Sequence, residues 1–314
     1  MNNIRNESGS DRIRRLIADK RQLLTIGAHD GLSGLLGERA GFDALWASGL
    51  EISASHGLPD ANILDMSVHL AGAAQIYDAV SIPVIADVDS GYGNAVNAAY
   101  TAKKFAKVGI AGICIEDNFF PKRNSFYTGT SRELVSTQEH ALKVQACKDS
   151  TDGELYVIAR TEALIAGFSM EEALDRAYAY ADAGADAILI HSKEKSPEQI
   201  IEFSNRWSGT IPLVAVPTTY NTITAKELGE LGYRIVIFAN HGLRASIKAV
   251  QNVYSELIVA GRACVLEKDI VSLKTVFELV GVKALEEMER RYMPSMQLDR
   301  NAPTLIEEVV KNVS

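Results

Sequence analysis

Two carboxylates spaced two residues apart, Asp87 and Asp89, directly follow the short apolar run Pro83–Ala86. A run rich in β-branched residues is typical of a buried parallel strand. If that strand continues to Asp89, both side chains point to the same side of it. Two buried like charges need compensation, and oxygen-only ligands suit Mg²⁺ or Mn²⁺. The pattern favours a metal site, and the alternative is a solvated strand end without an ion.

The run before Asp87 is one of eight similar apolar runs, which must together position these side chains. The eight runs are Leu23–Ala28, Ala44–Ala47, Pro83–Ala86, Gly112–Ile115, Tyr156–Ala159, Ala187–Ile190, Leu213–Val216 and Ile235–Ala239. Segments with helical periodicity lie between most of them, and several close at a glycine. This alternation predicts an α/β fold with a parallel sheet, and eight units predict a closed (β/α)8 barrel of the TIM type. Three C-terminal helices are predicted over His241–Ala260, Ser272–Val280 and Lys283–Tyr292.

Polar side chains follow the predicted strands, and in such barrels the active site lies at the C-terminal ends of the strands. Arg160 suits a phosphate or carboxylate group, and its alternative is a structural salt bridge. His191 would donate a hydrogen bond to an anionic substrate, unless it is a satisfied core histidine. Glu116 and Glu162 either serve a metal ion or form a buried ion network with Arg160.

Another polar segment, Ser48–Leu50, combines a hydroxyl group with consecutive backbone N–H groups and predicts a small anion-binding nest. Trp46, just before it, either packs in the core or forms a wall of the pocket. His29 and His241 follow the first and the last apolar run, and we expect both to support the residues that touch the substrate.

The connection Phe119–Thr130 is long for a strand-to-helix connection, which usually has about 2–6 residues. It combines three phenylalanines with Lys122, Arg123 and Asn124. This composition suits a lid that closes on an anionic substrate and excludes water. The alternative is an ordinary surface loop, in which the phenylalanines would be costly to expose.

Composition excludes several classes of protein. The chain has 314 residues, 47% of them hydrophobic, and a net charge of −8 without a basic patch, so we expect no nucleic-acid partner. The cysteines at 114, 147 and 264 predict neither disulfides nor a zinc site. No signal peptide or membrane span is apparent, and we expect a cytoplasmic protein. The expected organisation is a disordered arm over 1–10, a single barrel domain with its helices over 11–293, and a tail over 294–314.

The polar segments together resemble the phosphoenolpyruvate mutase branch of the isocitrate lyase superfamily. The resemblance covers most of the chain, and the matching segments are Ala28–Ser33, Trp46–Leu50, Pro59-Asp60, Asp87–Asn94, Glu116-Asp117, Phe120–Ser125, Ala159–Ala163, His191–Lys193 and Asn240-His241. It implies the same barrel, with its last helix swapped to a neighbouring subunit. It also implies a homotetramer, a dimer of dimers.

The resemblance further implies a metal-dependent reaction that interconverts phosphoenolpyruvate and phosphonopyruvate. Asp87 resembles the direct Mg²⁺ ligand of the family, and Asp89 and Glu116 resemble groups that hold the waters of the metal. Asp60 resembles a further member of that shell and is expected among the catalytic residues.

The substrate-binding groups of the family also have counterparts here. Arg160, His191 and Asn124 resemble those that hold the phosphoryl group. Ser48 and the backbone N–H groups of Gly49 and Leu50 resemble the groups that bind the pyruvyl portion of the substrate. Trp46 resembles the wall of that pocket.

Sister activities remain as alternatives. The segments Leu58–Leu64 and Gly93–Asn97 look closer to phosphonopyruvate hydrolase. The lid favours the mutase, because mutases carry the Asn-Ser pair that begins here at Asn124. The hydrolase has Thr in place of that Asn. One departure is Asn118, since the usual mutase pattern has Lys at this position. The Lys-Lys/Arg-Cys-Gly-His lid of the methylisocitrate lyase type is absent from residues 116–134. A non-catalytic binding barrel would predict broken site chemistry, which the polar strand ends do not show.

Overall fold

Eight parallel strands close into a barrel in the computed structural model, which describes residues 7–19, 21–122 and 133–293. Each strand pairs with its neighbours in chain order, and β8 closes on β1. The strands are β1 (Leu23–Ala28), β2 (Ala44–Ala47), β3 (Val84–Asp87), β4 (Gly112–Glu116), β5 (Tyr156–Thr161), β6 (Ala187–Ile190), β7 (Leu213–Ala215) and β8 (Tyr233–Phe238). Every predicted strand agrees within two residues at each end, so the predicted barrel is confirmed.

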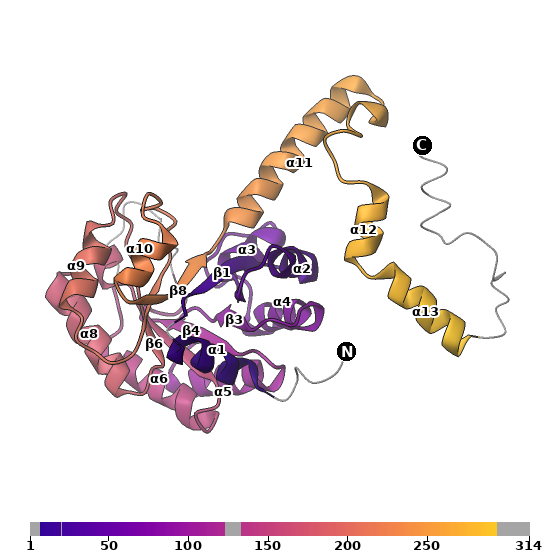
Figure 1. Ribbon diagram of the computed structural model, residues 1–314. Coiled ribbons are helices and arrows are strands. Elements are labelled where there is room, and N and C mark those ends of the chain that lie inside the picture. Colours follow the sequence, from indigo (N-terminus) through magenta and orange to yellow (C-terminus); the bar gives the residue numbers. More distant parts are fainter. Residues whose placement is uncertain (1–6, 20, 123–132, 294–314) are drawn as a thin grey trace. The chain divides into compact units, whose positions relative to one another are not determined.

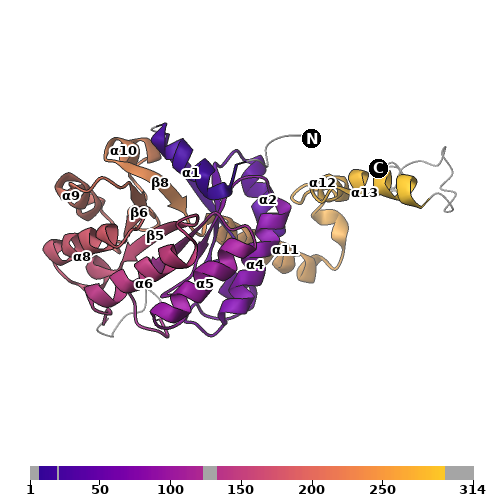
Figure 2. The same ribbon diagram turned by 90° about the horizontal axis from the view of Figure 1, so that it is seen from below.

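Helices surround the barrel, as Figures 1 and 2 show. They are α2 (Gly31–Arg39), α3 (Gly49–Ser55), α4 (Met66–Ala79), α5 (Ala95–Lys107), α6 (Thr137–Ser150), α7 (Ala163–Ala166), α8 (Met170–Asp182), α9 (Glu198–Arg206) and α10 (Ala225–Glu230). Most begin after a side chain that accepts a hydrogen bond from the first turn, as Asp30 does for α2 and Ser48 for α3. Where such a cap is present, it fixes where the chain leaves the strand end and turns back along the barrel.

Alternate side chains of the strands fill the interior of the barrel. The apolar interior cluster includes Leu23, Trp46, Ile85, Cys114, Ile158, Leu189, Val214 and Ile237. Helix α1 (Gly9–Ala18) adds the buried side chains of Ile13 and Leu16 to this cluster. With these side chains inside it, the barrel is a packed core rather than a channel.

Helix α1 begins at Gly9, so its first two residues lie within the arm predicted over residues 1–10.

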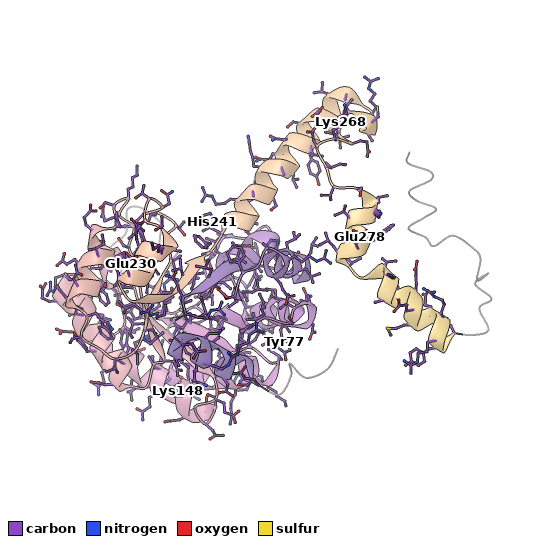
Figure 3. The ribbon with its side chains drawn as sticks, in the orientation of Figure 1. Tyr77, Lys148, Glu230, His241, Lys268 and Glu278 are labelled. Atoms are coloured by element: carbon purple, nitrogen blue, oxygen red, sulfur yellow. The ribbon has the colours of Figure 1, made fainter. Side chains whose placement is uncertain are left out.

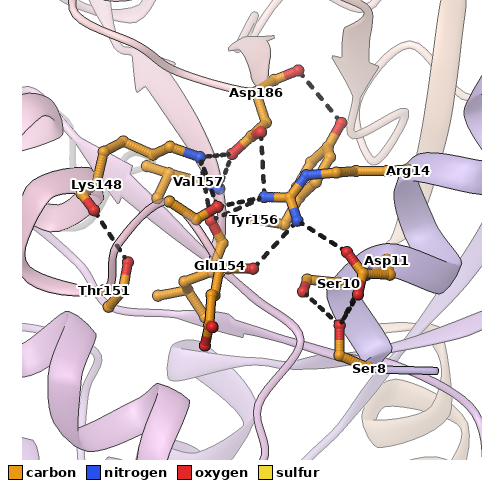
Figure 4. Close-up of polar contacts among 12 residues, drawn as sticks. Ser8, Ser10, Asp11, Arg14, Lys148, Thr151, Glu154, Tyr156, Val157 and Asp186 are labelled. Carbon is orange, nitrogen blue, oxygen red and sulfur yellow. Dashed lines mark hydrogen bonds and ion pairs between the residues drawn. The ribbon is translucent and has the colours of Figure 1, made fainter. Parts of the chain in front are cut away.

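A polar cluster holds α1 to the amino end of the barrel (Figure 4). The Arg14 guanidinium donates to the carbonyl oxygens of Gly153 (2.9 Å) and Glu154 (3.1 Å), just before β5. It also lies 3.4 Å from a carboxylate oxygen of Asp186, just before β6, whose other oxygen accepts from Lys148 Nζ at 2.7 Å. We call Arg14, Lys148 and Asp186 the amino-end cluster.

By its contacts the chain divides into two compact units, with the boundary after Leu243. The last strand leads into α11 (His241–Ala260), which is followed by a short 3₁₀ helix (Ala263–Val265), α12 (Leu273–Leu279) and α13 (Val282–Tyr292). Side chains stand out along these helices in Figure 3, and large apolar ones such as Ile258 and Val259 are exposed. The three predicted helices are confirmed, whereas the single domain over 11–293 and the helix swap stay predictions. Among the described residues, no helix combines the length and the apolar character needed to span a membrane.

Candidate active site

Asp87 and Asp89 lie at the carboxyl end of β3, but only Asp87 belongs to the strand. The strand ends at Asp87, and Asp89 has a φ of 51°, in the left-handed region. The side-chain alternation assumed for a continued strand therefore stops at Asp87. Both carboxylates nevertheless face Gly49, where an added Cβ would lie 3.4 Å from Asp89 Oδ1 and 3.5 Å from Asp87 Oδ2. A Cβ at this position would thus be in ordinary van der Waals contact with both carboxylates.

A buried lysine lies between two of the acidic side chains. Lys122 Nζ lies 2.8 Å from Asp60 Oδ1 and forms an ion pair with Asp89 Oδ1. Asn62 binds both partners, because its Nδ2 donates to Asp89 Oδ2 (2.5 Å) and its Oδ1 accepts from the backbone N–H of Lys122 (2.5 Å). Burial raises the pKa of Asp89, and the neighbouring carboxylates of Asp87 and Asp60 add to the rise against the effect of Lys122. Burial disfavours the charge on Lys122, but the carboxylates around it, Asp89 foremost, raise its pKa well above the usual value.

A second network joins the ends of β4, β5 and β6. Arg160 Nε lies 3.3 Å from Glu116 Oε2 and donates to Glu162 Oε1 at 2.7 Å. The same Glu162 oxygen lies 2.9 Å from His191 Nδ1, which in turn lies 3.0 Å from an Arg160 nitrogen. Glu162 thus takes part in the ion network that the sequence left as the alternative to metal binding. Burial raises the pKa of Glu116, while Arg160 opposes the rise.

Asn118, the departure from the usual mutase pattern, is buried beside this network. Its amide donates to Glu116 Oε1 at 2.8 Å. The neutral side chain therefore holds the second oxygen of Glu116, whose first oxygen faces Arg160.

One cavity of about 70 Å³ brings these groups together. The predicted site residues that line it are Trp46, Ser48, Leu50, Asp60, Asp87, Glu116, Arg160 and His191. Ser48 also caps α3, since its Oγ accepts from the N–H of Glu51 at 3.3 Å. We call the carboxylates of Asp60, Asp87 and Glu116 in this lining its acidic side, and Arg160 and His191 its basic side; Glu116 and Arg160 are in contact where the two meet. A lining with both signs of charge suits a small, highly charged anion bound together with a cation.

The lining also contains residues that were not among the predicted site residues. These are Lys122, Val216, Thr218, Ala239 and Asn240. Thr218 and Asn240 follow the seventh and the eighth strand, so their positions after strand ends could have indicated a place in the site. Lys122 was predicted only as a cation of the lid, because its burial between carboxylates depends on tertiary contacts.

Other predicted residues lie outside the cavity lining or outside the described part of the chain. Asn124 and most of the predicted lid are in the latter group, whereas Phe119 and Phe120 are described and about half exposed. His29 does not line the cavity, and its Nδ1 lies 2.9 Å from Glu51 Oε2. His241 begins α11 and packs edge-on against Phe238.

The donor set at the acidic side fits a divalent cation. Among the described residues, no three or more histidine, cysteine, aspartate or glutamate side chains are already arranged around a metal position. The available donors are nonetheless oxygens on buried or half-buried side chains, those of Asp60, Asp87, Asp89 and Glu116. Burial and, to a smaller extent, the repulsion among them raise the pKa of Asp89, and Lys122 supplies compensating charge of the kind that a hard cation would provide.

Comparison with known proteins gives related enzymes over nearly the whole chain. A phosphonopyruvate hydrolase of Variovorax sp. (strain Pal2) is 43% identical over 282 residues, which cover 89% of this chain and 97% of that protein. A phosphoenolpyruvate phosphomutase of Streptomyces hygroscopicus is 40% identical over 293 residues, which cover 93% of each protein. The two activities are thus both represented among close relatives.

Solved structures similar to this chain include enzymes of the same two kinds. The crystal structure of a phosphoenolpyruvate phosphomutase from Streptomyces platensis subsp. rosaceus has a TM-score of 0.89 and 48% identity, covering 91% of this chain and 99% of that one. A phosphonopyruvate hydrolase in complex with oxalate and Mg²⁺ has a TM-score of 0.86 and 40% identity over the same shares of the two chains. The family model for phosphoenolpyruvate phosphomutase matches residues 13–258. Fold, cavity and sequence agree, and the chain belongs to the phosphoenolpyruvate phosphomutase family.

Proposed function

We propose that this protein is a Mg²⁺-dependent phosphoenolpyruvate mutase that interconverts phosphoenolpyruvate and phosphonopyruvate. The observation that carries the proposal is the cavity lining, which combines Arg160 and His191 with a group of carboxylates that includes Asp87 and Glu116. A substrate with a phosphoryl group at one end and an enolate at the other matches both sides at once. The reaction breaks the bond between phosphorus and the enol oxygen and forms one between phosphorus and carbon 3 of the same pyruvyl unit. No atom enters or leaves the substrate.

The basic side would hold the migrating phosphoryl group. Glu162 fixes the orientation of both Arg160 and His191, so their donors are in place before the substrate arrives. Phosphoryl transfer through a loose transition state depends on such positioning and on charge stabilisation rather than on a covalent partner. Ser48, the N–H groups of Gly49 and Leu50, and the Trp46 ring would orient the pyruvyl portion.

The acidic side would hold the metal ion. Asp87 would bind Mg²⁺, or Mn²⁺ in its place, with Asp89, Glu116 and Asp60 around it. The ion would supply positive charge that stabilises the pyruvyl enolate. The solved hydrolase complex with Mg²⁺ supports a divalent cation in a related site.

The lid sequence favours the mutase over the hydrolase. Asn124 can both donate to and accept from a migrating phosphoryl group, and a closed lid would keep water from intercepting it. Hydrolysis to pyruvate and phosphate is the second candidate, supported by the 43% identity to the Variovorax hydrolase and by Leu58–Leu64, which looks closer to that enzyme.

The deciding experiment is ³¹P NMR of the purified protein with phosphonopyruvate and Mg²⁺. We expect a growing phosphoenolpyruvate signal. Inorganic phosphate without phosphoenolpyruvate would establish the hydrolase and would show that Asn124 does not decide the reaction. No change in either signal would remove both candidates.

We also propose a cytoplasmic homotetramer, a dimer of dimers, in which α11 packs on a neighbouring subunit. The exposed apolar side chains of α11, among them Tyr254, Ile258 and Val259, support a packing partner for this helix. Light scattering coupled to size-exclusion chromatography measures the mass of the assembly, and a monomer would contradict the proposal.

A further inference from the structure

A fully buried carboxylate, Asp117, lies behind the candidate site and lines no part of the cavity. Its Oδ1 accepts from the backbone N–H of Glu162 at 2.8 Å. Its Oδ2 accepts from Thr161 Oγ1 (3.0 Å), the Arg176 guanidinium (3.1 Å) and the Tyr180 hydroxyl (2.8 Å). Asp117 therefore ties the end of β5 to helix α8.

Arg176 extends this connection to the chain that follows the predicted lid. The same nitrogen that binds Asp117 donates to the carbonyl oxygen of Val135 at 3.0 Å, while the Val135 N–H donates to the Asp117 carbonyl oxygen at 3.0 Å. The neighbouring residue Leu134 forms a β-bridge with Asn118. One guanidinium thus joins α8, the end of β4 and the described residues just beyond the lid segment.

The connection reaches the substrate-binding groups through a single residue. Asp117 fixes the backbone of Glu162, and the Glu162 carboxylate orients Arg160 and His191. We propose that the Asp117–Arg176 pair is a positioning element that keeps these two side chains aligned with the phosphoryl group. This inference rests on the proposed function, because the role of Arg160 and His191 does.

Arg176 can act on the reaction only through other residues, since it is 5% exposed and does not line the cavity. Arg176 uses two nitrogens at once: Nε donates to Glu172 at 2.8 Å, and one terminal nitrogen donates to both Asp117 and Val135. An ammonium group has a single nitrogen and cannot reproduce this planar arrangement. Lysine would retain the charge but not all of these contacts, so Glu162 would lose part of its support. Small displacements of groups that contact a transition state lower kcat more than they weaken ground-state binding of the substrate.

The test compares Arg176→Lys with Arg14→Lys. Both substitutions replace a guanidinium that binds an aspartate and backbone carbonyl oxygens, but Arg14 belongs to the amino-end cluster. We expect Arg176→Lys to lower kcat roughly ten- to a hundredfold with KM within about threefold, whereas Arg14→Lys leaves kcat unchanged. Both variants are expected to lower Tm. Equal kcat values in the two variants would overturn the proposal.

Two further measurements keep the test decisive. Tyr180→Phe removes only one donor to Asp117 and is also expected to lower kcat. It replaces Arg176→Lys in the test if that variant does not fold. Calorimetric binding of inorganic phosphate to the full chain needs no turnover, so it still applies if the enzyme catalyses neither proposed reaction. In the proposed site inorganic phosphate depends on Arg160 and His191 without the contacts that hold the pyruvyl portion of the substrate. We therefore expect phosphate binding to weaken in Arg176→Lys more than KM rises, and more than it weakens in Arg14→Lys. Identical phosphate dissociation constants in the two variants would contradict the positioning role whatever the reaction is.

Discussion

The two ends of the barrel use charge in opposite ways. At the amino end, two cations share the Asp186 carboxylate, Arg14 also lies 3.5 Å from Asp11 Oδ1, and other contacts of Arg14 and Lys148 are with backbone carbonyl oxygens (Figure 4). At the carboxyl end, carboxylates outnumber the cations. The carboxylates there are those of Asp60, Asp87, Asp89, Glu116 and Glu162, and the permanent cations are Lys122 and Arg160.

This difference separates stability from function within one fold. The amino-end cluster pairs its charges and closes the barrel against α1, which agrees with the structural role of that face in such barrels. The carboxyl end keeps like charges close together, an arrangement that costs stability and is retained where a ligand uses it. We therefore expect substitutions at the two ends to separate into effects on turnover and effects on unfolding.

The largest expected effect is that of Asp87→Ala at the carboxyl end. Loss of the proposed metal ligand should lower turnover at least about a thousandfold. The Tm should not fall, because the substitution removes one of several neighbouring negative charges. Phosphonopyruvate conversion by ³¹P NMR measures the first quantity and differential scanning calorimetry the second. Normal turnover would end the assignment of Asp87 to the metal.

Lys122→Met tests whether a cation stabilises the acidic side. Removing the ammonium group from Asp60 and Asp89 should lower the free energy of unfolding by about 3 kcal/mol without metal. Mg²⁺ should then restore more stability in the variant than it adds to the original protein. The matched control is Lys148→Met, which removes an ammonium group from Asp186 at the amino end and should gain nothing specific from Mg²⁺. Urea unfolding with and without Mg²⁺ measures both, and equal gains would contradict the prediction.

Asp186→Asn should destabilise the amino end without a catalytic effect. The carboxylate accepts from Lys148, Arg14 and the backbone N–H of Val157, and an amide can replace only part of these contacts. We expect the free energy of unfolding to fall by about 1–3 kcal/mol, with kcat unchanged. Urea unfolding and the turnover assay check the two statements, and a lower kcat would show that the two ends are coupled.

The same contrast explains what could be predicted from the sequence. The strands were predictable because each is a short apolar run flanked by polar residues, and their order alone brings Asp87, Glu116, Arg160 and His191 to one end. Ser48 and Trp46 follow the same logic on β2. For all six residues, position at a strand end was sufficient, because a closed parallel barrel brings the carboxyl ends of its strands to the same end.

Other features depended on contacts that no local pattern encodes. Asp89 leaves the strand geometry through a positive φ, so its carboxylate is placed by Asn62 and Lys122 rather than by alternation. Lys122 was predicted as a cation of the lid, yet it is buried against a residue 62 positions earlier in the chain, Asp60. Asp117 and Arg176 are 59 positions apart and show no shared motif.

The smallest expected effect concerns the pH dependence of the carboxyl end, where His29 is paired with the buried Glu51. The hydrogen bond that the His29 ring donates to Glu51 raises the pKa of His29 above its ordinary value, so protonation of His29 stabilises the folded state. This contribution is complete below the unfolded pKa and is lost as pH rises through the raised folded pKa. His29→Gln should therefore cost about 1 kcal/mol of unfolding free energy near pH 5.5 and less near pH 9. The amino-end cluster contains no histidine, so Arg14→Lys should cost the same at both pH values, and urea unfolding of the two variants compares them. A pH-independent cost for His29→Gln would contradict the assigned protonation.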